Sequence, residues 1–219
     1  VTDSGSVKTP GEATAMKATL VRMLPKVELV HGDIRDIKTP VVVVGHYQGL
    51  PPVRAVGALD EALDRWISKA VARGMIGGGL GEVFLIPNTQ AGLAANAVIL
   101  AGMGEYGRFN REDLDLLFAN VTYGVTALGW REFATVVIGS GEGNLSLEQA
   151  VEGMIGGVES ALRRLHGQGH LDRLSIVEYD AGRCKAIAHT LDEIFGIHDD
   201  SKRRSFTPKE LPKRTRRTT

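Results

Sequence analysis

The stretch Val41-Val42-Val43-Val44 is an uninterrupted apolar run that is too short to form a helix. A run of this length and composition is typical of a strand buried on both faces, as in a sheet covered by helices on both sides. Pro51 and Pro52 follow and end the segment. The run therefore predicts an inner strand of an α/β protein.

The segments around this run alternate between short apolar strands and amphipathic helices. Further strands are predicted over residues 24–30, 82–86, 97–101, 135–138 and 174–179. Helices with one apolar face are predicted over residues 53–73, 110–129, 146–165 and 180–195. In the third helix, Gly153, Gly156 and Gly157 are costly and predict close packing against the sheet or the approach of a ligand. The alternation predicts a three-layer α/β/α sandwich with a mixed, largely parallel sheet.

Composition divides the 219 residues into three segments. Residues 1–22 show no sustained period and are predicted to be a flexible lead-in, and residues 23–198 are predicted to form the folded domain. Residues 199–219 contain prolines, threonines and few apolar residues, as a basic flexible tail or linker does. Eight of the 26 Lys and Arg residues, but one of the 26 Asp and Glu residues, lie from Lys202 onward, which leaves residues 1–201 with a net charge of about −7.

Charge and composition also limit the partners. An acidic folded part is a poor binder of nucleic acid, so nucleic acid is expected only through the basic tail. No apolar run reaches the roughly 18 residues of a membrane span, so no membrane partner is expected. The single cysteine, Cys184, lies in a helical pattern with no base beside it, which indicates an unreactive thiol and a reducing compartment. We therefore expect a cytoplasmic protein.

The first candidate ligand loop is Gly32-Asp33-Ile34, directly after the opening strand. The Asp33 carboxylate could accept a hydrogen bond from the amine of an adenine or from a ribose hydroxyl. A plain Gly-Asp turn explains the same residues.

The second loop is Gly77-Gly78-Gly79-Leu80-Gly81-Glu82, in which the amides of Gly78 and Gly79 could approach a phosphate. It lacks the Gly-Lys-Ser/Thr ending of a phosphate-binding P-loop and precedes a strand, which excludes the usual nucleotide-hydrolysing motif. A surface turn is the alternative.

The third loop is Gly139-Ser140-Gly141-Glu142-Gly143-Asn144, which runs from a strand into the helix that Ser146 begins with a capping box. The free amides and dipole of a helix N-terminus favour an anion there. Glu142 opposes this interpretation because a carboxylate repels phosphate, so a structural turn is the alternative.

Catalytic and metal-binding patterns are scarce. The six histidines show no metal spacing of the His-Glu-x-x-His kind, and His166 and His170 are separated by glycines. There is no Gly-x-Ser-x-Gly elbow and no pair of carboxylates in a shared predicted cleft. The sequence therefore predicts no catalytic residue, no metal ligand and no cofactor.

Three stretches taken together resemble the N-terminal domain of leucine aminopeptidases. They are Gly57-Ala58-Leu59-Asp60-Glu61-Ala62-Leu63, Gly79-Leu80-Gly81-Glu82-Val83-Phe84-Leu85-Ile86-Pro87 and Val98-Ile99-Leu100-Ala101-Gly102-Met103-Gly104. The resemblance covers about residues 24–196. It implies a fold similar to that of macro domains, which bind ADP-ribose.

The same resemblance implies roles for the candidate loops. Asp33 would face the adenine amine, Ile34 would offer a backbone N–H, and Gly141 and Gly143 would line the pyrophosphate. Where hydrolytic macro domains have an Asn-rich segment, this chain has Gly45-His46-Tyr47-Gln48-Gly49, which counts against hydrolysis of ADP-ribose. The candidate ligand-binding residues are Asp33, Ile34, Gly78, Gly79, Gly139, Ser140, Gly141, Gly143 and Asn144.

In leucine aminopeptidases the metals and the active site belong to the C-terminal domain, and its Asn-Thr-Asp-Ala-Glu-Gly-Arg segment does not occur in these 219 residues. Three functions stay open. The first is a non-catalytic accessory domain that serves assembly or regulation of an attached protease or effector domain, either through other domains of the parent protein or through self-association. The second is a sensor of a nucleotide or ADP-ribose-like ligand. The third is a fragment of a metal-dependent aminopeptidase.

Overall fold

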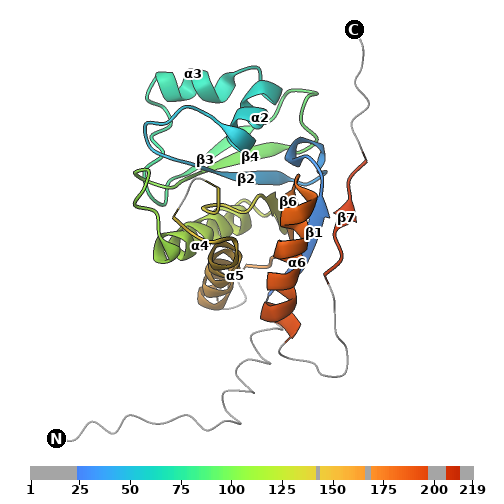
Figure 1. Cartoon of the computed structure of the whole chain (residues 1–219). Helices are drawn as coiled ribbons and strands as arrows, with labels where there is room; N and C mark the ends of the chain where they lie inside the picture. The colour runs from blue at the N-terminus through green and yellow to red at the C-terminus, as the bar shows by residue number, and fades with distance from the viewer. Residues whose placement is uncertain (1–23, 142–143, 166–168, 197–205, 213–219) are drawn as a thin grey trace, which may run out of the picture.

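The computed structural model describes residues 24–141, 144–165, 169–196 and 206–212, which build a mixed sheet with helices on both faces (Figure 1). The strands are β1 (Lys26–His31), β2 (Val41–His46), β3 (Val83–Pro87), β4 (Ala97–Gly102), β5 (Glu132–Thr135), β6 (Arg173–Glu178) and β7 (Lys209–Glu210). Their order is β3-β4-β2-β5-β6-β1-β7. β3 pairs antiparallel with β4, and the other pairs are parallel. The predicted α/β/α sandwich with a mixed, largely parallel sheet is confirmed.

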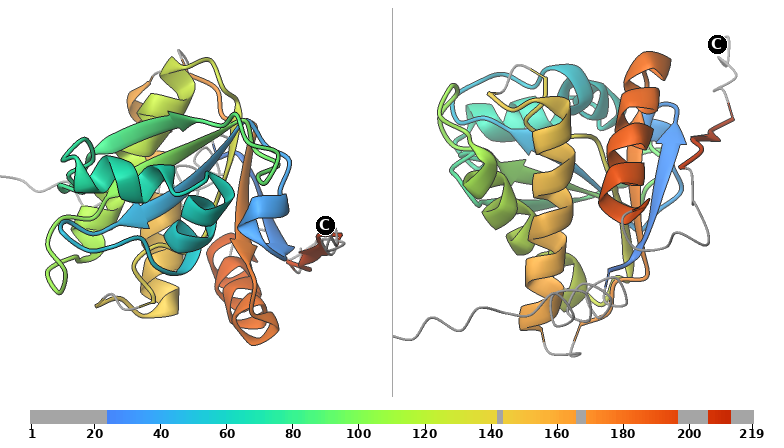
Figure 2. Two further views of the ribbon diagram at one scale, coloured as in Figure 1. Left: turned by 90° about the horizontal axis from the view of Figure 1, so that it is seen from above. Right: turned by 60° about the horizontal axis from the view of Figure 1, so that its bottom comes forward.

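The helices form the two outer layers (Figures 1 and 2). One face of the sheet carries the short 3₁₀ helix η1 (Ile34–Asp36), α2 (Arg54–Ala62) and α3 (Trp66–Ala72), and the other carries α4 (Arg111–Ala127), α5 (Leu147–Arg164) and α6 (Ala181–Gly196). Val41 and Val43 pack in the core beneath α4 to α6, whereas Val42 and Val44 pack beneath α2 and α3. All four side chains are fully buried, which confirms the prediction of a strand buried on both faces.

The predicted helix over residues 53–73 is two helices, α2 and α3, separated by a break. Asp64 and Arg65 adopt left-handed backbone conformations with φ of 54° and 61°. The buried Asp60 carboxylate accepts hydrogen bonds from the backbone N–H and the hydroxyl of Ser68, at 3.0 and 2.5 Å. This carboxylate satisfies the start of α3, and the helical spacing of the apolar residues continues across the break, so periodicity alone does not reveal it.

The strand predicted over residues 135–138 lies earlier, at β5. Residues 132–135 make the pairs with β2 and β6, and the apolar residues that follow leave the sheet. Val136, Val137 and Ile138 instead line the cavities described below. The apolar residues of this stretch therefore belong partly to a strand and partly to a cavity wall.

The glycines of α5 face α4, and neither the sheet nor a ligand explains them. A Cβ atom on Gly157 would lie 2.5 Å from the carbonyl oxygen of Asp115, and one on Gly153 would lie 2.9 Å from the Leu114 side chain. Close packing is confirmed, but its partner is a neighbouring helix.

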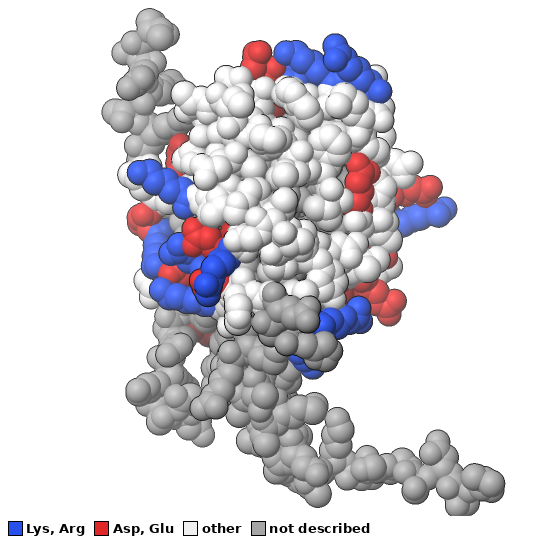
Figure 3. All heavy atoms as spheres, turned by 180° about the vertical axis from the view of Figure 1, so that it is seen from behind, with Lys and Arg blue, Asp and Glu red and all other residues white. Residues whose placement is uncertain are grey.

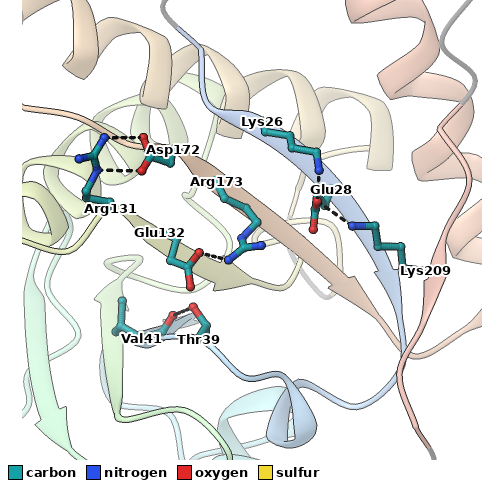
Figure 4. A network of polar contacts seen from close by, with 9 residues as sticks. All are labelled: Lys26, Glu28, Thr39, Val41, Arg131, Glu132, Asp172, Arg173 and Lys209. Atoms are coloured by element: carbon teal, nitrogen blue, oxygen red, sulfur yellow. Dashed lines mark hydrogen bonds and ion pairs between the residues drawn. The ribbon is translucent and has the colours of Figure 1, made fainter.

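Part of the segment predicted as a flexible tail is packed against the sheet. β7 pairs with β1, and Leu211 donates its backbone N–H to the carbonyl oxygen of His31 at 3.0 Å. The Nζ atoms of Lys26 and Lys209 both lie 2.7 Å from Glu28 Oε1 (Figure 4). The prediction of flexibility is wrong for residues 209 and 210, because their charged side chains find partners on β1.

Candidate ligand-binding site

A cavity of about 560 Å³ opens at the carboxyl ends of β1 and β6 and beside the segment that follows β5. Ligands of open α/β sheets bind at such ends, because the loops that follow the strands gather there. The cavity is lined by Gly32, Asp33, Ile34, Arg54, Ala55, Ala58, Val136, Val137, Ser140, Gly141, Val177, Glu178, Tyr179, Asp180 and Arg183. Four of the predicted residues, Asp33, Ile34, Ser140 and Gly141, thus come together at one site.

The Asp33 carboxylate is engaged by its neighbour Arg35. It accepts the backbone N–H of Arg35 at 2.9 Å, which caps η1, and forms an ion pair with the guanidinium at 2.5 Å. Both oxygens of the carboxylate accept from this guanidinium. An adenine amine would therefore have to share Asp33 with Arg35.

Arg183 ties two walls of the cavity together. Its guanidinium donates to Ser140 Oγ at 2.9 Å and to Glu178 Oε2 at 2.9 Å, while its backbone N–H donates to Asp180 Oδ1 at 2.7 Å. The last bond confirms Asp180 as the residue that begins α6. Arg183 thereby fixes the loop after β5 against the end of β6 and brings a positive charge to the cavity wall.

A smaller cavity of about 130 Å³ adjoins the first and shares Arg54, Ala55, Val136, Val137 and Gly141 with it. His46, at the end of β2, lines it and is 3% exposed. The Nε2 atom of His46 has no hydrogen-bond partner among the residues that the structure describes. Burial lowers the pKa of His46 despite the opposing effect of Glu82, so the imidazole is neutral at neutral pH.

Gly78 and Gly79 line neither of the two cavities. The Glu82 carboxylate accepts the backbone N–H groups of Gly77 and Gly79, at 3.2 and 3.0 Å. A Cβ atom on Gly78 would lie 2.9 Å from the backbone nitrogen of Gln48. Of the two amides predicted to approach a phosphate, that of Gly79 therefore meets a carboxylate of the chain itself, and the glycine at position 78 permits close packing.

The remaining predicted residues belong to the loop after β5. Gly139 lines the smaller cavity, with a φ of 90° that favours glycine. Asn144 donates from its side chain to the carbonyl oxygen of Gly107 at 2.5 Å and lines neither cavity. Gly143 and Glu142 lie outside the described residues.

The sequence did not single out Arg54, Tyr179 or Arg183, although all three line the larger cavity. A signal for two of them was available: Arg54 and Arg183 each stand in the first turn of a helix. A basic residue at such a position, after the carboxyl end of a strand, is a candidate for a ligand contact.

The described residues offer no reactive thiol, no metal-binding cluster and no membrane-spanning helix. Burial raises the pKa of the Cys184 thiol to about 11. Residues 24–141, 144–165, 169–196 and 206–212 hold no group of three His, Cys, Asp or Glu side chains placed to bind a metal ion. Within the same residues, every helix is too short or too polar to cross a membrane.

Solved structures with a similar fold include several macrodomains. The Trypanosoma brucei macrodomain in complex with ADP has a TM-score of 0.63 and 14% identity, covering 85% of this chain and 92% of its own. A mutant of the Oceanobacillus iheyensis macrodomain with ADPR has a TM-score of 0.61 and 17% identity, covering 78% and 94%. The macrodomain of Mycobacterium tuberculosis DarG has a TM-score of 0.56 and 16% identity, covering 69% and 97%.

These identities show a shared fold and nothing more. A search of curated proteins found no match. Residues 43–163, more than half of the chain, match the family described as the cytosol aminopeptidase family, N-terminal domain. With the macrodomain-like fold and the cavity at the carboxyl ends of its strands, this chain belongs to the cytosol aminopeptidase family through its N-terminal domain.

Proposed function

We propose that this chain is a non-catalytic accessory domain of a larger protein, and that its cavity binds a nucleotide or an ADP-ribose-like ligand. The observation that carries the proposal is the 560 Å³ cavity at the carboxyl ends of β1 and β6, with two arginines in its lining. Such a cavity is large enough for a nucleotide-sized molecule. The attached domain that it would assemble or regulate is a protease or another effector.

The lining combines two arginines with three carboxylates, Asp33, Glu178 and Asp180, and the arginines are the groups that would meet the phosphates of a nucleotide. Arg54 and Arg183 supply positive charge, and the loop with Ser140 and Gly141 leads into α5, whose N-terminus favours an anion. Asp33 also lines the cavity, where its carboxylate is paired with Arg35, so an adenine amine would compete with this guanidinium. In the adjoining cavity, His46 Nε2 offers a hydrogen bond to a part of the ligand that reaches beyond the arginines.

Two of the similar structures support the choice of ligand. The Trypanosoma brucei macrodomain is in complex with ADP, and the Oceanobacillus iheyensis mutant is with ADPR. Two carboxylates of the lining, Asp33 and Glu178, are paired with Arg35 and Arg183, so we propose binding without a reaction. The single cysteine is consistent with a cytoplasmic location, which is part of the same proposal.

Isothermal titration calorimetry of the full chain with ADP-ribose and with ADP tests the proposal. The variant Gly141→Val places two methyl groups in the cavity, where a Cβ atom would lie 3.8 Å from the Arg54 guanidinium, an ordinary contact distance. We expect binding by the wild type and its loss in this variant. Gly196→Val, in open space at the end of α6, is the matched control and should bind normally. The proposal would be contradicted if the wild type gave no binding heat at millimolar ligand, or if Gly141→Val bound the ligand as tightly as the wild type does.

A second candidate is an interaction domain that binds no small ligand. It is favoured by the pairing of Asp33 with Arg35, which already occupies the carboxylate that would select an adenine. The same titrations separate the two functions. Titrations in which the wild type gives no binding heat would support the interaction domain, provided that the Gly141→Val variant folds and assembles normally with the attached domain.

A further inference from the structure

β3 forms one edge of the sheet, and no described residue pairs with its outer side. In the view from above, β3 and β4 lie at the opposite edge from β1 (Figure 2). An edge strand presents unpaired backbone N–H and C=O groups, which are a template for another strand.

The direction of these groups follows from the pairing with β4. Glu82 accepts from Gly102, and Asn88 donates to Asn96, at the two ends of the strand. Bonded and non-bonded positions alternate along an antiparallel pair, so Phe84 and Ile86 bond to β4 while Val83 and Leu85 direct their backbone groups outward. Pro87, which has no N–H, falls on an outward position and leaves the bonds to β4 intact.

The two edges of the sheet are protected differently. At the β1 edge, β7 covers Val30 and His31, and Lys26, Glu28 and Lys209 form an ion-pair network (Figure 4). Charges and a covering segment are the usual protection of an edge against pairing with another chain. At the other edge, the sequence from Val83 to Gly104 contains no Asp, Glu, Lys or Arg.

The side chains of β3 are apolar and incompletely buried. Val83, Phe84 and Leu85 keep part of their surface exposed, and the Trp66 ring, 37% exposed, lies 6.2 Å from the Phe84 ring. The rear face of the molecule carries its charged side chains mainly around the margin, with few at the centre (Figure 3). A strand without charged side chains, with unpaired backbone groups along its outer side, is suited to pairing with a β-strand of the same kind.

We propose that β3 pairs antiparallel with β3 of a second copy of this chain, around a two-fold axis at Phe84. In this register Val83 lies opposite Leu85 of the other copy, so both outward N–H groups of each strand find carbonyl oxygens and the prolines are not used. Phe84 faces its own symmetry mate, flanked by the two Trp66 rings. Identical strands can pair in this way because no like charges meet.

The occupant is a second copy because the strand is complementary to itself. Between Val83 and Gly104 the edge has no charged side chain, so an identical strand would place apolar side chains against apolar side chains with no like charges facing each other along it. An isologous contact closes after two copies, so the assembly is a dimer.

Sedimentation velocity and sedimentation equilibrium of the full chain test this proposal. We expect a species of twice the 23.5 kDa chain mass at micromolar concentration. Phe84→Lys and Phe84→Glu should each raise the dimer dissociation constant by about tenfold or more, because like charges then lie directly opposite. Mixing the two variants should restore a dimer, because opposite charges then face each other at the axis.

Tyr179→Lys, a charge placed on an exposed side chain just after β6 and four strands away from β3, is the matched control and should dimerise normally. Circular dichroism establishes that each variant is folded. If the Phe84 variants do not fold, Leu85→Pro replaces them, since it removes an outward N–H and no bond to β4. A wild-type monomer at high concentration overturns the proposal. A dimer that persists in these variants, or an assembly of more than two copies, also overturns the proposal.

Discussion

His31 donates from Nδ1 to the carboxylate of Glu210 at 2.8 Å, which joins the first strand of the sheet to its last. The Nε2 atom of the same ring lies 3.1 Å from the carbonyl oxygen of Tyr179. Both neighbours are acceptors, so the geometry fits a ring that carries protons on both nitrogens. The pKa of His31 is raised, chiefly by the hydrogen bond to Glu210.

This relationship predicts a pH dependence for the packing of residues 206–212. A group whose pKa is raised on folding stabilises the folded form fully below its unfolded pKa, which is about 6.5 for histidine. That contribution is lost as the pH rises through the raised folded value. We therefore expect the Leu211 amide, bonded to His31, to exchange its hydrogen faster relative to the intrinsic rate as the pH rises through this window.

Hydrogen exchange of the Leu211 amide between about pH 5 and pH 9 measures the effect, with NMR titration of His31 alongside. His31→Gln should remove the pH dependence, whereas His189→Gln, on an exposed position of α6, should retain it. A His31 that titrates at or below its ordinary pKa would contradict the prediction.

Asp33 has a structural role that complicates any test of its part in ligand binding. Asp33→Ala removes the cap of η1 and the partner of Arg35, and should lower the free energy of unfolding by about 1 kcal/mol. Asp33→Asn keeps an oxygen that can accept the Arg35 N–H and should lose less. Urea denaturation of both variants measures the difference. Equal losses would show that the cap contributes nothing.

The glycines of α5 differ in what a methyl group would meet. Gly157→Ala places Cβ 2.5 Å from the Asp115 carbonyl oxygen and should cost about 1–3 kcal/mol of stability, because the α4 backbone would have to move. Gly156→Ala meets its nearest atom, Asp115 Oδ1, at 3.4 Å and should be neutral or stabilising by up to about 1 kcal/mol.

The pair of α5 variants is its own control, since the two substitutions are chemically identical and adjacent in one helix. Chemical denaturation gives the free energy of unfolding of each. If the two alanines had the same effect, tight contact between α4 and α5 at Gly157 would not be the reason for that glycine.

The layers of the fold could be predicted because the apolar spacing and the capping residues of each segment indicate its strands and helices. The valines of β2 are buried on both sides, and the capping boxes at Asn110 and Ser146 begin α4 and α5. The break before α3 could not be predicted, because it depends on a buried Asp60 carboxylate that reaches Ser68 eight residues later. β7 escaped prediction because Lys209 and Glu210 look like solvent-exposed tail residues until Glu28 and His31 are beside them.

The candidate site was predictable to a similar extent. Asp33, Ser140 and Gly141 belong to loops that directly follow strands, and parallel strands bring such loops together. The role of Glu82 was not predictable, because a glycine-rich loop looks the same whether an internal carboxylate or a phosphate meets its amides. Arg183 required the structure, because its hydrogen bond to Ser140 joins residues 43 positions apart.

The packing of Leu211 on Gly32 has a mechanical consequence. A Cβ atom at Gly32 would lie 2.7 Å from the Leu211 side chain, and the next residue, Asp33, lines the larger cavity. Leu211 therefore limits how far the backbone at Gly32 can move toward it. Because Gly32 and Asp33 are adjacent in one loop, the packing of Leu211 links the position of β7 to that of one wall of the larger cavity.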